Sequence, residues 1–130
     1  MFKQLQNPNF HDGIILNLNI DFELKQTRIR IKQVSGLNDG KYVISELLFD
    51  EVVWQDFEYI KSFNCIWGIE VSESFEDFQN DYYDYLVKMS DSFEILGKVK
   101  NDATLKYYKL MSSAGLDGFL ICRNLIAKEI

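Results

Sequence analysis

Apolar and polar residues alternate between Ile14 and Phe22, and this alternation constrains the fold more than any other feature of the sequence. The even positions are all apolar over nine residues, and three of the odd positions carry Asn or Asp. A period of two is typical of a β-strand with one buried face. Residues 26–34 repeat the pattern, with Ile29 and Ile31 on the apolar face. The two segments are therefore expected to pair as a hairpin with one solvated face.

Further strands are predicted where β-branched and aromatic residues gather. An Asp39-Gly40 pair inside Leu37–Gly40 is typical of a turn between antiparallel strands, because both residues tolerate positive φ. Asp50 and Glu51 interrupt the next apolar stretch and predict a turn or bulge. The remaining strands are expected at residues 42–49, 52–57, 65–71, 105–111 and 119–127.

The apolar period changes to three and four residues after Ser74. We predict one longer helix near residues 75–89, with Ser74 and Asp77 in the pattern of a capping box. The segment 90–102 is expected to be a connection with a short element at 93–96 that Gly97 ends.

Together these elements predict an α+β protein that is mainly antiparallel β. We expect a curled sheet or sandwich of about six to eight strands, with the helix covering one face or one end. A chain of 130 residues is expected to form a single domain over residues 1–130, with one sufficient core.

Two cysteines and the beginning of the chain bear on the compartment. Cys65 and Cys122 lie among apolar residues, where a free thiol behaves as a small hydrophobe, so both are expected to be reduced. The first residues have no apolar stretch of signal-peptide length, and apolar runs elsewhere are short. We therefore expect a cytoplasmic protein that does not bind a membrane.

Acidic residues concentrate in the middle of the sequence. Between Asp50 and Glu94, twelve acidic side chains stand against two basic ones, whereas the whole chain has a formal charge of -6. A field of one sign steers a partner of the opposite sign. Nucleic acid is disfavoured as a partner, because Arg28, Arg30 and Lys32 fit the solvent face of a strand.

The predicted helix carries the candidate binding residues. A solvated helix face is the simpler interpretation of its charge, and a surface for a basic protein is the functional one. Helical spacing places Tyr82 and Tyr85 toward the core, which leaves Tyr83 and one of Tyr107 or Tyr108 as exposed candidates. The predicted partner-binding residues are Glu73, Glu76, Asp77, Asp81, Tyr83 and Asp84.

The sequence offers little support for catalysis. His11 is the only histidine, which excludes a multi-histidine metal site, and a turn before the first long strand is its simplest role. Phosphate-binding, dinucleotide-binding, nucleophile-elbow and metalloprotease motifs are absent. We therefore predict no catalytic residues, no cofactor and no metal.

The order of these motifs resembles small β-rich immunity proteins of bacterial polymorphic toxin systems and their relatives. The motifs that carry the resemblance are Phe10-His11-Asp12-Gly13, residues 48–52 with Trp54 and Phe57, residues 64–71, and residues 108–122. The resemblance spans most of the chain and implies a non-catalytic cytoplasmic protein that binds and neutralises one toxin domain. It assigns no binding residue.

Three functional hypotheses remain open from the sequence. The first is a non-enzymatic protein, such as an immunity protein, that binds a basic toxin domain through its acidic surface. The second is a small enzyme or small-molecule-binding protein with a pocket near His11. The third is a homo-oligomeric structural module, for which a homodimer is the simplest form.

Overall fold

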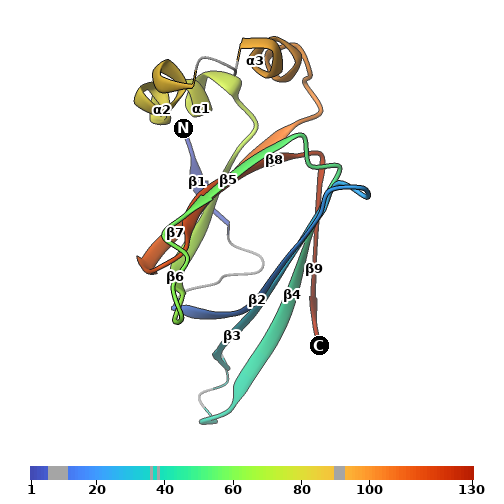
Figure 1. Ribbon diagram of the computed structural model, residues 1–130. Coiled ribbons are helices and arrows are strands. Elements are labelled where there is room, and N and C mark those ends of the chain that lie inside the picture. Colours follow the sequence, from blue (N-terminus) through green and yellow to red (C-terminus); the bar gives the residue numbers. More distant parts are fainter. Residues whose placement is uncertain (6–11, 36, 38, 90–92) are drawn as a thin grey trace.

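The computed structural model in Figure 1 describes residues 1–5, 12–35, 37, 39–89 and 93–130. Nine antiparallel strands of this part of the chain form one sheet, in the order β5-β8-β7-β6-β2-β3-β4-β9, with β1 beside β6. The predicted α+β class, mainly antiparallel, is confirmed. The strands are β1 Lys3–Gln4, β2 Gly13–Asp21, β3 Gln26–Val34, β4 Tyr42–Asp50, β5 Trp54–Glu58, β6 Cys65–Ser72, β7 Lys106–Ala114, β8 Asp117–Cys122 and β9 Asn124–Glu129.

The sheet folds over on itself into two halves. We call β5, β8, β7 and β6 the helix-side half, and β2, β3, β4 and β9 the far half. The halves meet where Gly13 pairs with Ile66 and Ile14 with Cys65. Opposite this junction, the chain crosses between the halves from β4 to β5 and returns from β8 to β9, so residues 51–53 and Arg123 form the corner. The end strands β5 and β9 do not pair with each other, so the sheet is curled rather than closed.

One hydrophobic core lies between the two halves. Ile29 and Ile31 of β3 point into it as predicted, and both are fully buried. Phe49 of β4 meets Tyr108 of β7 across this core, with ring centroids 5.3 Å apart. Side chains from both halves therefore join the halves into a sandwich.

A second core lies between the helix-side half and the helices. Figure 1 shows α1 Phe75–Asp81, α2 Tyr83–Lys88 and α3 Phe93–Lys100 above this half of the sheet. Phe78 of α1 and Val99 of α3 are buried against Tyr107, Phe119 and Ile121 of β7 and β8. The molecule thus has three layers, and β7 and β8 lie in the middle one.

A β-bulge changes the predicted orientation of β2 at its beginning, whereas Leu18, beyond the bulge, packs on the core as predicted. The alternation predicts that Leu16 points to the core, but its side chain is 49% exposed. Ile15 pairs with Ile31 and Asn17 pairs with Arg30, which leaves Leu16 as the extra residue between them. The extra residue shifts the alternation by one position on the N-terminal side of the bulge. The side chain of Ile15, rather than that of Leu16, therefore packs on the core.

Three other predicted elements differ from the structure. The expected strand at 119–127 is two strands, because the chain turns at Arg123 from the helix-side half to the far half. The expected helix at 75–89 is interrupted at Tyr82, where φ is -113° and ψ is 24°. Tyr82, at this break, and Tyr85, in α2, both pack on Phe119. Helix α3 continues through Gly97, where the prediction ended the element at that glycine.

Both cysteines are free, as predicted, and the structure separates their environments. Cys65 is partly exposed, whereas Cys122 is buried in the core between the two halves. Burial raises the pKa of the Cys122 thiol to about 12, since a thiolate is disfavoured in an apolar environment.

We therefore expect iodoacetamide to label Cys122 only after unfolding, because the thiolate is the reactive form. Mass spectrometry should find at most one adduct on the native chain at pH 7.5, at Cys65, and two adducts in urea. Rapid labelling of Cys122 in the native protein would contradict its assigned burial.

Candidate functional site

The predicted acidic helix face begins at a well-defined N-terminus. Ser74 caps α1, and its hydroxyl accepts a hydrogen bond from the backbone N–H of Asp77 at 3.3 Å, as the predicted capping motif requires. The carboxylate of Asp77 does not complete a capping box, because it accepts a hydrogen bond from the Ser72 hydroxyl at 2.6 Å. Glu76 and Asp77 lie in the first turn, where negative charge is favoured by the helix dipole.

Intramolecular cations compensate part of the charge on half of the predicted site. Glu73 lies 3.9 Å from the ammonium of Lys106, and this largely exposed pair compensates its charge only weakly. Asp77 forms an ion pair with the N-terminal amine, and the hydrogen bond from that amine holds the pKa of this carboxyl below its usual range. Asp81 pairs with Lys109. These three carboxylates therefore present less net charge than the sequence indicates.

The other three predicted residues remain available to a partner. Tyr83 is 62% exposed, and Glu76 and Asp84 are exposed as well. No ion pair between described residues involves Glu76 or Asp84. The structure thus divides the predicted face into a neutralised part, which lies toward β7 and the N-terminus, and an available part.

The tyrosine predictions are correct on the helices and wrong on β7. Tyr82 and Tyr85 pack against the second core, as expected. Tyr107 and Tyr108 are only 3% and 4% exposed, so neither is the predicted exposed residue. They point to opposite faces of β7, and both faces are covered because this strand lies in the middle layer.

Sequence reasoning missed three acidic residues at the end of β5 and the start of β8. Asp56, Glu58 and Asp117 surround a cavity of about 160 Å³, whose remaining wall comes from Tyr82, Tyr85, Gly118 and Phe119. The Tyr85 hydroxyl donates a hydrogen bond to Asp56 at 2.7 Å. We call this group of side chains the acidic cup.

Like charges face each other directly in the acidic cup. Glu58 and Asp117 are register partners in the β5–β8 ladder. Carboxylates at such positions repel each other and destabilise the strand pair. No ion pair in the described part of the chain brings a cation to Asp56, Glu58 or Asp117. The arrangement therefore favours a positively charged group from outside.

The same field acts on the tyrosines that line the acidic cup. Burial raises the pKa of Tyr82, and the nearby carboxylates of Asp117 and Asp81 raise it further. The pKa of Tyr85 rises for the same main reason, burial, together with its hydrogen bond to Asp56. Both phenols are therefore neutral at physiological pH, and their rings can stack on a cation.

Exposed apolar side chains continue from the acidic cup along the chain. Tyr59, Ile60 and Phe63 follow β5 directly and are 68%, 62% and 56% exposed. Strand β5 is also an end of the sheet, so one edge of its backbone has no strand partner among the described residues. Exposed aromatic residues beside a free strand edge are typical of surfaces that bind another protein.

The basic residues on the far half form ion pairs within the sheet. Glu46 of β4 is nearly buried, and its carboxylate lies 3.1 Å from Arg30, 3.7 Å from Arg28 and 3.9 Å from Lys128. These cations cover and neutralise Glu46. The positive charge on this face is therefore partly compensated within the sheet.

The described residues contain no group of three or more His, Cys, Asp or Glu side chains placed to hold a metal ion. They also contain no helix that combines the length and the apolar character needed to cross a membrane. The pocket predicted near His11 falls outside the described residues, as does Asn38 of the predicted turn.

The chain matched no family model, no curated protein and no solved structure in comparisons with known proteins.

Proposed function

We propose that this chain is a non-enzymatic binding protein for a basic protein partner, and that it acts as a cytoplasmic immunity protein against a basic toxin domain. The observation that carries the proposal is the acidic cup, where three carboxylates meet two tyrosine rings and no described residue supplies a neutralising cation. An arginine or lysine side chain of the partner would enter the cup and relieve the repulsion between Glu58 and Asp117.

The surroundings of the acidic cup supply the other components of an interface. Tyr83 and Asp84 directly follow Tyr82 in the chain, and Glu76 is a further exposed carboxylate on α1. Tyr59, Ile60 and Phe63, which follow β5, offer apolar contacts. Interfaces of this kind combine aromatic anchors with a polar rim. Long-range attraction between opposite charges would speed association and weaken it in salt.

Capture from the native host, with matched charge variants, tests the proposal. We expect the wild-type protein to retain a specific basic polypeptide at low salt. A Glu58→Lys/Asp117→Lys variant should reduce the affinity for that polypeptide about tenfold or more, since reversal introduces repulsion where attraction is expected. Mass spectrometry identifies the retained protein, and calorimetry with the purified pair measures the affinity at 50 and 300 mM salt.

A Glu23→Lys/Glu129→Lys variant is the control, because it changes the net charge equally at two exposed positions outside the candidate site. It should bind within about twofold of the wild type. Reversal of Glu76 and Asp84 should weaken binding further. Equal loss in both double variants, or failure to retain any basic polypeptide, would contradict the proposal.

A further inference from the structure

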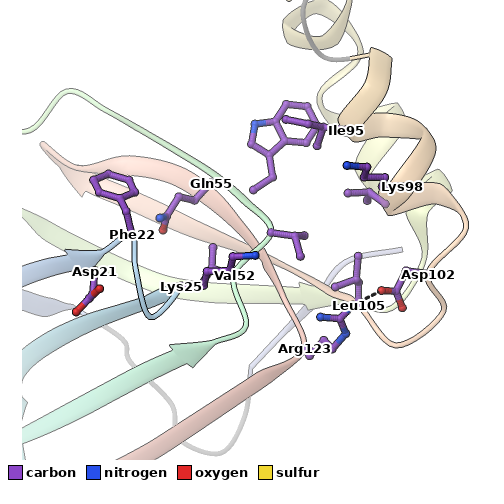
Figure 2. Close-up of a pocket in the computed structure, with 13 residues that line it drawn as sticks. Asp21, Phe22, Lys25, Val52, Gln55, Ile95, Lys98, Asp102, Leu105 and Arg123 are labelled. Carbon is purple, nitrogen blue, oxygen red and sulfur yellow. Dashed lines mark hydrogen bonds and ion pairs between the residues drawn. The ribbon is translucent and has the colours of Figure 1, made fainter.

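A second cavity lies on another side of the molecule and shares no residue with the acidic cup. Its volume is about 520 Å³. It opens between the β2–β3 turn, the corner that joins β4 to β5, and helix α3. Figure 2 shows Phe22 of the turn and Ile95 of α3 on opposite sides of the opening. Cavities of several hundred Å³ are of the size that binds small molecules.

The floor of the cavity is apolar and fixed. Val52, Val99 and Leu105 line it, and they are 8%, 2% and 2% exposed because they also belong to the two cores. Trp54 adds an aromatic wall that packs against Phe78 and Phe119. These side chains are held from behind, so the floor is formed before any ligand arrives.

The acidic groups at the cavity are already satisfied. Asp21 accepts a hydrogen bond from the backbone N–H of Leu24 at 2.9 Å. Asp102 accepts hydrogen bonds from Thr104 and pairs with Arg123. The bonds from Thr104, and then that from Arg123, hold the pKa of Asp102 below its usual range, so this carboxyl stays charged. The guanidinium of Arg123 is therefore already occupied by an intramolecular ion pair.

Two lysines at the same cavity have no comparably strong ion pair with a described residue. Lys25 takes part in no ion pair between described residues. Among the described residues, Lys98 pairs only with Glu94, 3.8 Å away on the same helix, and both side chains are more than three-quarters exposed. A pair so exposed contributes little free energy and is easily exchanged. An apolar floor therefore lies beside two available ammonium groups.

We propose that this cavity binds a medium-chain monocarboxylate, with its hydrocarbon chain on the apolar floor and its carboxylate at Lys25 and Lys98. Each methylene that leaves water should tighten binding by about fourfold. Phe22, whose ring is 82% exposed at the mouth, would cover the chain once it is bound. The site does not depend on the acidic cup, so the two proposals stand or fall separately.

Tryptophan fluorescence tests this binding directly, because Trp54 lines the cavity and is one of only two tryptophans. In a Trp67→Phe background, Trp54 is the single reporter. Titration with octanoate should change its emission with saturation. Octan-1-ol, which has the same chain without the charge, should bind at least about fivefold more weakly, and octylammonium more weakly still.

Single-residue variants test whether Lys98 and Lys25 bind the carboxylate of octanoate. Lys98→Gln should weaken octanoate binding by about threefold to tenfold, the effect of losing one exposed or partly exposed charged contact. Lys100→Gln is the control, since Lys100 lies on the same helix outside the cavity, and it should bind as the wild type does. Lys25→Asn should weaken binding similarly, and asparagine tolerates the φ of 55° at this position.

A Val53→Phe variant tests the place of binding, because Val53 lines the cavity, a larger side chain should narrow it, and phenylalanine leaves Trp54 as the single tryptophan reporter. Octanoate should then bind at least about tenfold more weakly, while circular dichroism and the melting temperature remain close to those of the wild type. Octanoate that causes no saturable change, equal binding of octan-1-ol, or equal effects of Lys98→Gln and Lys100→Gln would overturn the proposal.

Discussion

Replacement of Phe78 by alanine is expected to lower the free energy of unfolding by about 3–5 kcal/mol, the usual loss for a buried phenylalanine. Phe78 is fully buried, and its ring centroid lies 5.0 Å from Phe119 and 5.3 Å from Tyr107. These rings come from strands of the middle layer and cannot move into the vacated space without disturbing the sandwich. A cavity would therefore remain between the helices and the sheet.

Urea unfolding, followed by circular dichroism, measures this loss. Phe78→Leu is the control, because it retains most of the apolar volume and should lose less than half as much. Hydrogen exchange should accelerate in α1 and α2 more than in β3, since Ile29 and Ile31 lie in the other core. A loss below about 1 kcal/mol for alanine would mean that Phe78 does not anchor the helix layer.

Substitution of Gly118 by alanine is expected to lower the free energy of unfolding by about 2–4 kcal/mol, since it combines a steric clash with an unfavourable backbone conformation. A Cβ atom at Gly118 would lie 2.2 Å from the backbone oxygen of Asp56, and the φ of this residue is +154°. Strand β8 would have to move away from β5. Binding of a basic partner should weaken too, because the acidic cup is built across these two strands.

Gly97→Ala is the matched control for this substitution. Gly97 lies inside α3, and a Cβ atom there would meet nothing within 4 Å. Alanine should stabilise the helix at this position by up to about 1 kcal/mol. Thermal and urea unfolding of both variants should therefore shift in opposite directions. Wild-type stability in Gly118→Ala would show that β5 and β8 do not approach each other as described.

The sequence predicts the local elements of this fold better than their connections. The apolar positions Ile29 and Ile31 identify the buried face of β3 correctly, because one side of that strand is solvated. The prediction for Leu16 on β2 is wrong, since a bulge is a feature of how β2 pairs with β3 and leaves no mark on the alternation. The break at Arg123 is hidden in a similar way, because apolar residues continue on both sides of it.

The sequence predicts only the part of the candidate site that depends on local helical spacing. Helical spacing brings Glu76, Tyr83 and Asp84 to the surface, and that much can be read locally. The neutralisation of Asp81 by Lys109 joins residues 28 positions apart and follows only from the packing of α1 on β7. The pair Glu58 and Asp117 depends on the register between β5 and β8, which short-range patterns do not specify.

The middle layer leaves this protein few places where its sequence can change freely. Tyr107 and Ile121 face the helices, whereas Tyr108 and Leu120 face the far half, so neighbouring positions on β7 and β8 serve different cores. Tolerance to substitution should therefore be concentrated at exposed positions, on α1 and α2 in an outer layer and at the end of the edge strand β5. A chain built in this way can acquire a new partner preference by exchanging surface side chains, while its interior stays the same.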